Sequence, residues 1–349
     1  LMCAGEIAAD LPPDELLSSN LLREHGIREP LYLAALHHAG VEITADMKPA
    51  SLRTLQLSAA QKQQVVTAAK DPPEAPALLE ASHISFSYPN GKKALRDVSV
   101  TVRKGEMLSI VGTNGAGKST FSKVVCGFEQ QQEGTLTFDG RDLMQRSIKE
   151  RADHIGYVMQ NPNQMLCKVQ IFDEVALGLV SRGVGEDETR EHVESALRIC
   201  GLFPFRKWPV SALSFGQKKR VTIASLLALD PELIILDEPT AGQDFRHYTE
   251  IMDFLRELNR RGVTVVMITH DMHLMLEYCR RSVVFSDGRV IADASPAQIL
   301  TDEAIIRQAS LKKTSLYDLA LLCEIEDPRM FVRRFIDYDR EVRGNDESV

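Results

Sequence analysis

The chain repeats one pattern, in which short apolar runs alternate with longer stretches of helical period. Residues 83–88 alternate between apolar and polar side chains as a half-buried strand does, and Pro89-Asn90-Gly91 predicts a turn after them. Four further apolar runs are predicted as strands, at 107–111, 155–159, 233–236 and 264–268. Helical patterns at 119–126 and 249–258 lie between them. Strands that alternate with helices predict an α/β fold with a parallel core sheet that is covered on both faces.

The last third of the chain changes character. Asp287-Gly288 predicts a hairpin, residues 296–338 have a helical pattern, and residues 344–349 look frayed. The longest apolar runs are of strand length, well short of the roughly 18–20 residues that a membrane span needs. We therefore expect any work at a membrane to go through a partner.

Composition excludes some classes of function. The chain has 349 residues, 44% of them hydrophobic and 26% charged, and its net charge of −8 argues against a protein that neutralises a nucleic-acid backbone. Basic pairs at 260–261 and 333–334 are expected to be solvated helix ends. The six cysteines are scattered, without metal spacing, as in a reduced cytosolic protein, and no signal peptide is visible.

The two ends of the chain resemble each other. Residues 5–17 align with residues 288–300, and after a small insertion Leu31-Tyr32 and Ala35-Leu36 match Leu316-Tyr317 and Ala320-Leu321. We expect residues 1–70 to be the tail of a preceding copy of the main domain; the alternative is an unrelated N-terminal helical domain. Residues 71–77, rich in proline, are predicted to be a stiff linker.

A glycine-rich loop follows the strand at 107–111. It fits the full pattern of a phosphate-binding loop, whose backbone N–H groups and following helix N-terminus face an anion. Lys118 is expected to reach the β- and γ-phosphates, and Ser119 to ligate Mg²⁺. The residues expected to hold the nucleotide here are Gly112, Asn114, Gly115, Gly117, Lys118, Ser119 and Thr120. A chance glycine turn is the alternative.

Polar residues stand at the ends of the other apolar strands. Asp237 ends the run at 233–236, where a Mg²⁺-organising carboxylate belongs, although an aspartate there could instead cap a helix. Glu238 is the candidate general base for an attacking water. His270 could hold that water and the γ-phosphate, and Gln160 could bind Mg²⁺ or the water. A packed or solvated histidine is the plain alternative. Tyr88, upstream of the loop, could stack on adenine or could be a core aromatic.

A second helix start adds another candidate anion site. Leu213-Ser-Phe-Gly-Gln217 places Ser214, Gly216 and Gln217 there. With these motifs in order, residues 78–300 resemble an ABC-transporter ATPase subunit: a P-loop NTPase cassette with a parallel core sheet, an antiparallel β subdomain and a helical signature subdomain, followed by a helical extension at 301–349. The resemblance implies ATP and Mg²⁺ as cofactors and a second cassette as partner, since each signature motif completes the other cassette's site. It also implies a role for Asp244, although Gln243 departs from the leucine usual before it.

The glutamine loop indicates a branch of the family. Gln160-Asn-Pro-Asn-Gln164, the run at 171–175 and the C-terminal extension resemble the energy-coupling factor importers of cobalt and vitamins; two fused cassettes resemble the ATPases of hydroxymethylpyrimidine/thiamine import. This implies a peripheral protein at the cytoplasmic face of the membrane, with a transmembrane coupling subunit and a substrate-binding membrane subunit. Residues 160–179, including exposed-looking Asp173 and Glu174, are expected to contact the membrane partner; alternatively, the two acids only cap or solvate a helix.

Two rival functions remain at this point. A soluble, non-transport ABC ATPase acting on nucleic acid or the ribosome predicts a basic surface, zinc cysteines or a long insertion between the phosphate loop and the signature motif. A degenerate cassette that binds ATP without hydrolysing it predicts loss of catalytic residues, whereas Lys118, Glu238 and His270 are all present.

Overall fold

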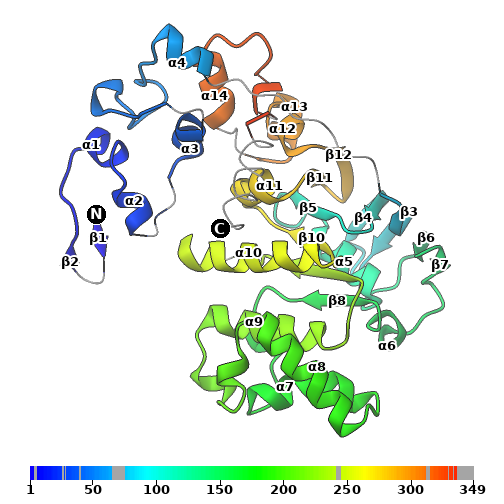
Figure 1. Cartoon of the computed structure of the whole chain (residues 1–349). Helices are drawn as coiled ribbons and strands as arrows, with labels where there is room; N and C mark the ends of the chain where they lie inside the picture. The colour runs from blue at the N-terminus through cyan, green and yellow to red at the C-terminus, as the bar shows by residue number, and fades with distance from the viewer. Residues whose placement is uncertain are drawn as a thin grey trace.

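The core of the molecule is a six-stranded sheet in the order β12-β11-β5-β10-β9-β8 (Figure 1). The computed structural model describes residues 1–3, 6–25, 27, 29–38, 41–64, 75–240, 245–311, 315–328, 330–332 and 334–335. The strands are β5 Met107–Gly112, β8 Ile155–Val158, β9 Leu233–Asp237, β10 Thr264–Ile268, β11 Arg281–Ser286 and β12 Arg289–Ala294. All neighbours pair in parallel except β12, which is antiparallel to β11. Parallel pairing brings the carboxyl ends of β5, β9 and β10 to one edge of the sheet.

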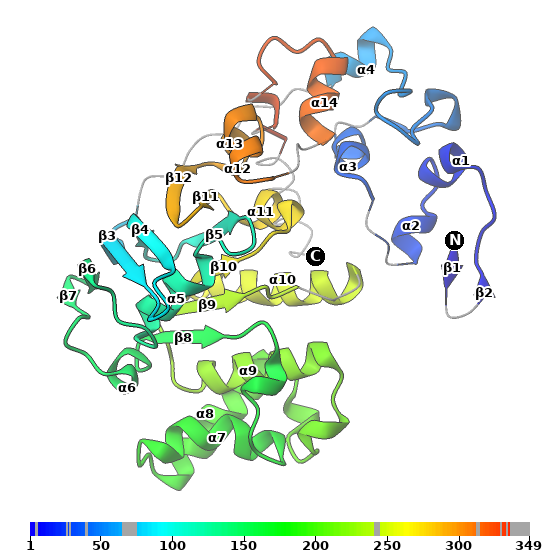
Figure 2. The ribbon, with the colours of Figure 1, turned by 180° about the vertical axis from the view of Figure 1, so that it is seen from behind.

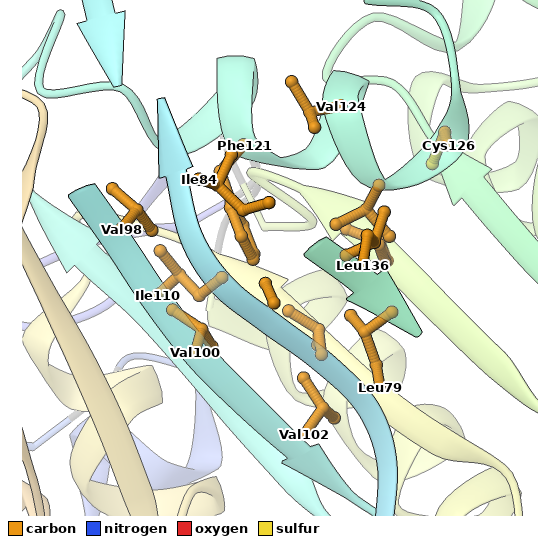
Figure 3. Close-up of a cluster of buried hydrophobic side chains, with 14 of the residues drawn as sticks. Leu79, Ile84, Val98, Val100, Val102, Ile110, Phe121, Val124, Cys126 and Leu136 are labelled. Carbon is orange, nitrogen blue, oxygen red and sulfur yellow. The ribbon is translucent and has the colours of Figure 1, made fainter. Parts of the chain in front are cut away.

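A four-stranded antiparallel sheet packs on this core. Its order is β4-β3-β6-β7, with β3 Ala77–Ser87, β4 Lys93–Arg103, β6 Glu133–Phe138 and β7 Arg141–Asp142. Apolar side chains of this sheet meet the helix α5 (Lys118–Cys126) and β5 in one buried cluster, of which Figure 3 labels Leu79, Ile84, Ile110, Phe121 and Leu136. This packing fixes the start of α5, where the glycine-rich loop ends.

A group of helices lies at one end of the molecule, with α7 (Ile171–Ser181), α8 (Glu186–Ile199) and α9 (Phe215–Leu227) side by side (Figures 1 and 2). The group has its own buried cluster, which includes Ile171, Val175, Val193, Leu197 and Val221. The short helix α6 is Ile148–Arg151, and the long helix α10 (Phe245–Arg260) contacts both α9 and β10. The start of α9 therefore belongs to a helical group with its own core, whereas the phosphate loop belongs to the core of the sheets.

The N-terminal and C-terminal segments share a third core. The first segment contains β1 Met2–Cys3, β2 Glu6–Ile7, α1 Pro13–Leu17, α2 Leu21–Glu24, α3 Leu31–His38 and α4 Ala59–Gln64. The second contains α11 Met272–Tyr278, α12 Pro296–Ile299, α13 Glu303–Gln308 and α14 Ser315–Leu322. Helix α3 packs on α14 (Figure 2). Leu33, Leu36, Leu316 and Leu319 are fully buried in one cluster.

The predicted fold class is confirmed in each of its parts: parallel core sheet, antiparallel subdomain, helical subdomain and helical C-terminal extension. The hairpin at Asp287-Gly288 forms with both residues at positive φ, 48° and 76°, as a two-residue hairpin turn requires. Gly5, most of the predicted linker, Asp244 and residues 344–349 lie outside the described residues. Among the described residues, no helix combines the length and apolar character that crossing a membrane requires.

Candidate functional site

The glycine-rich loop is held by close backbone contacts that only glycine permits. Gly112 has φ 139°, and a Cβ there would lie 2.0 Å from the carbonyl oxygen of Phe285. Gly117 has φ 106°, and its Cβ would lie 2.6 Å from the carbonyl oxygen of Ala94. Gly117 is also the N-cap residue of α5, and it makes no side-chain cap. The first turn of α5 contains Ser119 and Thr120, and its N–H groups face the loop. The loop and helix thus fit a bound phosphate chain.

Lys118 folds back over this loop. Its ammonium donates to the carbonyl oxygens of Gly112 at 2.8 Å and Thr113 at 2.9 Å, and the side chain is 7% exposed. Burial lowers the pKa of Lys118, while the carboxylates of Glu238 and Asp237 oppose that shift. The charges of Lys118, Glu238 and Asp237 therefore act on one another.

Glu238 is bonded at both its backbone and its carboxylate. Its N–H donates to the carbonyl oxygen of Ile268 at 2.8 Å, and one carboxylate oxygen lies 2.7 Å from Nδ1 of His270. The Thr269 hydroxyl donates to the other oxygen at 3.5 Å. The Glu238 side chain is 12% exposed and that of His270 is 68% exposed, so the pair lies at the mouth of the site. The structure thus brings together two of the three predicted catalytic residues, Glu238 and His270, whereas no hydrogen bond among the described residues joins Gln160 to them.

Asp237 accepts a hydrogen bond from Tyr157, a residue that sequence reasoning missed. The Tyr157 hydroxyl donates to a carboxylate oxygen of Asp237 at 3.1 Å. Burial, followed by the charge of Asp237, raises the pKa of the Tyr157 phenol, so it remains a donor at neutral pH. The side chain of Asp237 is therefore oriented by β8. Carboxylate, hydroxyl and amide oxygens, such as those of Asp237, Ser119 and Gln160, are ligands of the kind that Mg²⁺ prefers. That these three residues hold Mg²⁺ stays a prediction.

The predicted signature residues lie at the start of α9. The hydroxyl of Ser214 accepts from the N–H of Gln217 at 3.3 Å, and the side chain of Gln217 accepts from the N–H of Ser214 at 3.0 Å. Ser214 is exposed and Gly216 is buried. This reciprocal capping box satisfies two backbone donors of the helix. The serine edge is thus presented to solvent by the helical group.

Gln160 and Tyr88 are placed at the margins of the site. Gln160 is exposed just beyond β8. Tyr88 is half-buried; its hydroxyl lies 3.1 Å from that of Thr120, and its ring packs edge-on against Phe86 at 4.9 Å between centroids. Adenine stacking on Tyr88 stays a prediction.

The expectation that Glu174 is exposed is wrong. Glu174 is 4% exposed, and its carboxylate accepts from the N–H groups of Cys167 at 2.8 Å and Lys168 at 2.6 Å. Asp173, by contrast, is exposed. An acidic side chain can be buried when it satisfies backbone donors, as Glu174 does. It therefore holds the segment after the glutamine loop in place instead of presenting charge to a partner.

Lys219, on the second turn of α9, was also missed. It is 1% exposed, and its ammonium donates to the carbonyl oxygens of Glu238 at 2.6 Å and Pro239 at 2.7 Å. The signal for it was present in the helical period, because Lys219 lies on the buried stripe with Gly216 and Ile223.

Parts of the chain match the models of known protein families. The description "ABC transporter" matches residues 95–241, which include the phosphate loop, the signature motif and Glu238. The description "ATP-binding cassette cobalt transporter" matches residues 19–86, in the N-terminal segment and the start of β3.

The chain is also similar to ABC transporter ATP-binding proteins and to solved structures of such cassettes. An ABC transporter ATP-binding protein of Clostridium perfringens is 54% identical over 99% of this chain and 61% of its own length; one of Enterococcus faecalis is 55% identical over 98% and 61%. The chain thus spans 61% of the length of these curated relatives. The structure of cbiO1 from Clostridium perfringens, part of the transporter complex cbiONQ, is 34% identical with a TM-score of 0.62, over 71% of this chain and 99% of that one. A dimeric post-hydrolysis state of the cassette MJ0796 with ADP and Pi is 28% identical with a TM-score of 0.57, over 63% of this chain and 99% of that one.

Proposed function

Because the chain belongs to the ATP-binding cassettes of ABC transporters, we propose that it binds and hydrolyses MgATP to drive an importer of the energy-coupling factor type. The observation that carries this proposal is the gathering of Lys118, Asp237, Glu238 and His270 at the carboxyl edge of the core sheet. A carboxylate beside a histidine can accept a proton from water, and a buried lysine beside a glycine loop can hold a phosphate.

Each residue has one part in the proposed reaction. The loop from Gly112 and the start of α5 hold the phosphates, and Lys118 neutralises their charge. Ser119, Asp237 and Gln160 would hold Mg²⁺, which when bound withdraws charge from the phosphate oxygens. Glu238 takes the proton of the attacking water, and His270 keeps the Glu238 carboxylate aimed at it.

A second cassette would complete the cycle. The self-capped start of α9, with Ser214 exposed, is the surface that would meet a nucleotide held by a partner. ATP contacting both faces stabilises a closed pair of cassettes, and hydrolysis removes that difference in affinity. Asp244, beyond the described residues, is proposed to lie at the same interface.

We also propose that residues 1–70 are the tail of a preceding cassette, joined through the linker at 71–77 to the cassette at 78–300. Two observations support this. The order hairpin, helix, helix, helix occurs in both β1–α3 and β11–α14. The two corresponding helices, α3 and α14, pack on each other in one core.

The proposed setting is the cytoplasmic face of a membrane. The partners would be a transmembrane coupling subunit, contacted through residues 160–179, and a substrate-binding membrane subunit. The match to a cobalt transporter description favours a metal ion as cargo, and the resemblance to two-cassette hydroxymethylpyrimidine/thiamine ATPases favours a vitamin precursor. Purification from membranes, followed by binding assays with cobalt and with hydroxymethylpyrimidine, separates the two.

The test of hydrolysis is Glu238→Gln, which keeps the size of the side chain but replaces its basic carboxylate with a neutral amide. We expect ATP binding to persist and turnover to fall at least about a hundredfold, roughly 2.7 kcal/mol on the barrier. Phosphate release under saturating MgATP measures this. Unchanged turnover would remove Glu238 from the reaction.

A further inference from the structure

A lysine buried in the helical group reaches the catalytic loop of the core sheet. Lys219 is 1% exposed, yet two of its ammonium protons are donated to the carbonyl oxygens of Glu238 and Pro239. The same ammonium lies over the ring of Phe215, with Nζ 5.7 Å from the ring centroid. A buried ammonium is tolerated only where such acceptors surround it. The contact therefore constrains both groups that it joins, α9 and the segment after β9.

Glu238 needs such a constraint because of its backbone. Its φ of 48° lies in the left-handed region, which costs a side-chain-bearing residue about 1–2 kcal/mol. The N–H of Glu238 is fixed to β10 through Ile268, and its carbonyl oxygen is fixed to α9 through Lys219. These two bonds hold the peptide groups on either side of the Cα atom and so set the direction in which the carboxylate leaves the chain.

The charges around Lys219 suit this role. Burial lowers the pKa of Lys219 to about 8, against the attraction of Glu238 and Asp237, so the ammonium is mostly protonated at neutral pH. A charged donor makes stronger bonds to a carbonyl oxygen than a neutral amine does.

We propose that Lys219 is a positioning residue that aims Glu238 and ties its orientation to the signature helix. The idea rests on the proposed ATP hydrolysis. Because Ser214 begins the helix that carries Lys219, a shift of α9 on docking to a partner's nucleotide would move the carbonyl oxygens that Lys219 holds. The orientation of Glu238 in one cassette thereby depends on whether the signature motif of the same cassette is docked to a partner's nucleotide.

The variant Lys219→Met tests this in the full-length protein, since it keeps the length of the chain and removes its donors. We expect kcat to fall between about 10-fold and 100-fold, as for a small misplacement of a reacting group, while the KM for ATP stays within about threefold. Lys219→Arg, which restores cationic donors, should recover part of kcat. Lys218→Met is the matched control: its ammonium, at the neighbouring position, donates to Asn163 at 3.0 Å, and its loss should change kcat by less than about twofold.

A crystal structure of Lys219→Met provides a readout that needs no activity. We expect the peptide after Glu238 to rotate and the contact with His270 to lengthen. If that contact and the left-handed φ are retained, or if kcat matches the unsubstituted protein, the inference is overturned. A loss of unfolding temperature with kcat unchanged, or equal losses in Lys219→Met and Lys219→Arg, would assign Lys219 a purely structural role. Absence of hydrolysis in the unsubstituted protein would refute the proposed function, and the structural comparison would still decide the inference.

Discussion

Two helix N-termini in this molecule are candidates for binding phosphate, and they are built differently. Helix α5 begins at Gly117 without a side-chain cap, whereas α9 begins at Ser214 with a complete capping box. The donors of α5 are left to a ligand, and Lys118 stands beside them. At α9 the serine hydroxyl and the Gln217 side chain already satisfy the helix from within. The first terminus is thus suited to bind an anion by itself, and the second only to add to a site formed elsewhere.

The largest test of this difference removes the charge beside α5. Lys118→Ala should raise the Kd for ATP by at least about a hundredfold, because the phosphates then face backbone donors alone. Titration with a fluorescent ATP analogue measures the affinity. Lys123→Ala, in the last turn of the same helix, is the control and should bind as before. If Lys118→Ala and Lys123→Ala bind ATP with equal affinity, the start of α5 is no more specialised for binding phosphate than the start of α9.

A backbone change should have the next largest effect. Gly117→Ala would place a methyl group 2.6 Å from the carbonyl oxygen of Ala94 at φ 106°, whereas Gly115→Ala, at φ 80°, meets nothing within 4 Å. Both substitutions strain the backbone by about 1–2 kcal/mol, and only the first adds the overlap. We expect Gly117→Ala to lower the free energy of unfolding further, by about 1 kcal/mol or more beyond Gly115→Ala. Urea unfolding of the two variants compares them directly; equal losses would contradict the close approach.

A substitution at the capped start of α9 should change the turnover of ATP and not the affinity for ATP. Ser214→Ala removes a hydroxyl that is expected to face the partner's nucleotide, so we expect turnover to fall between about 10-fold and 100-fold with little change in the Kd for ATP. The measurement is ATPase activity over a range of protein concentrations. Hydrolysis that stays first order in a cassette without a fused partner, down to nanomolar protein, would contradict the need for a second signature motif.

The phosphate side could be predicted from sequence because its parts are local. A glycine pattern after an apolar run, and acidic or histidine residues at strand ends, keep their meaning whatever the neighbouring strands are. Gly112 to Ser119, Glu238 and His270 are of this kind. The fold class followed from the same alternation of strands and helices.

Contacts between elements distant in sequence could not be predicted in this way. Tyr157 reaches Asp237 only because β8 lies beside β9, with Val158 opposite Leu236. Glu174 was expected in solvent and Lys219 was missed, because charged side chains are usually exposed. Each is buried because backbone groups from another segment meet its charge. Burial of a charge depends on partners that the local pattern does not contain.

Tyr157→Phe is the smallest of the expected effects and tests the metal side of the comparison. The substitution removes the hydroxyl that donates to Asp237 at 3.1 Å and leaves the ring contact with Phe128 in place. A ligand that loses its supporting hydrogen bond typically binds its metal about 10-fold to 100-fold more weakly. We expect a loss of about tenfold, because the phosphate oxygens also bind the metal. The concentration of Mg²⁺ at half-maximal hydrolysis should therefore rise, while saturating Mg²⁺ restores most of the turnover. Phe128→Leu, which alters the ring contact alone, should leave that concentration unchanged. If excess Mg²⁺ does not restore the turnover of Tyr157→Phe, the tyrosine acts on the catalytic loop and not on the metal. The comparison between the α5 site and the α9 site would then rest on the other variants.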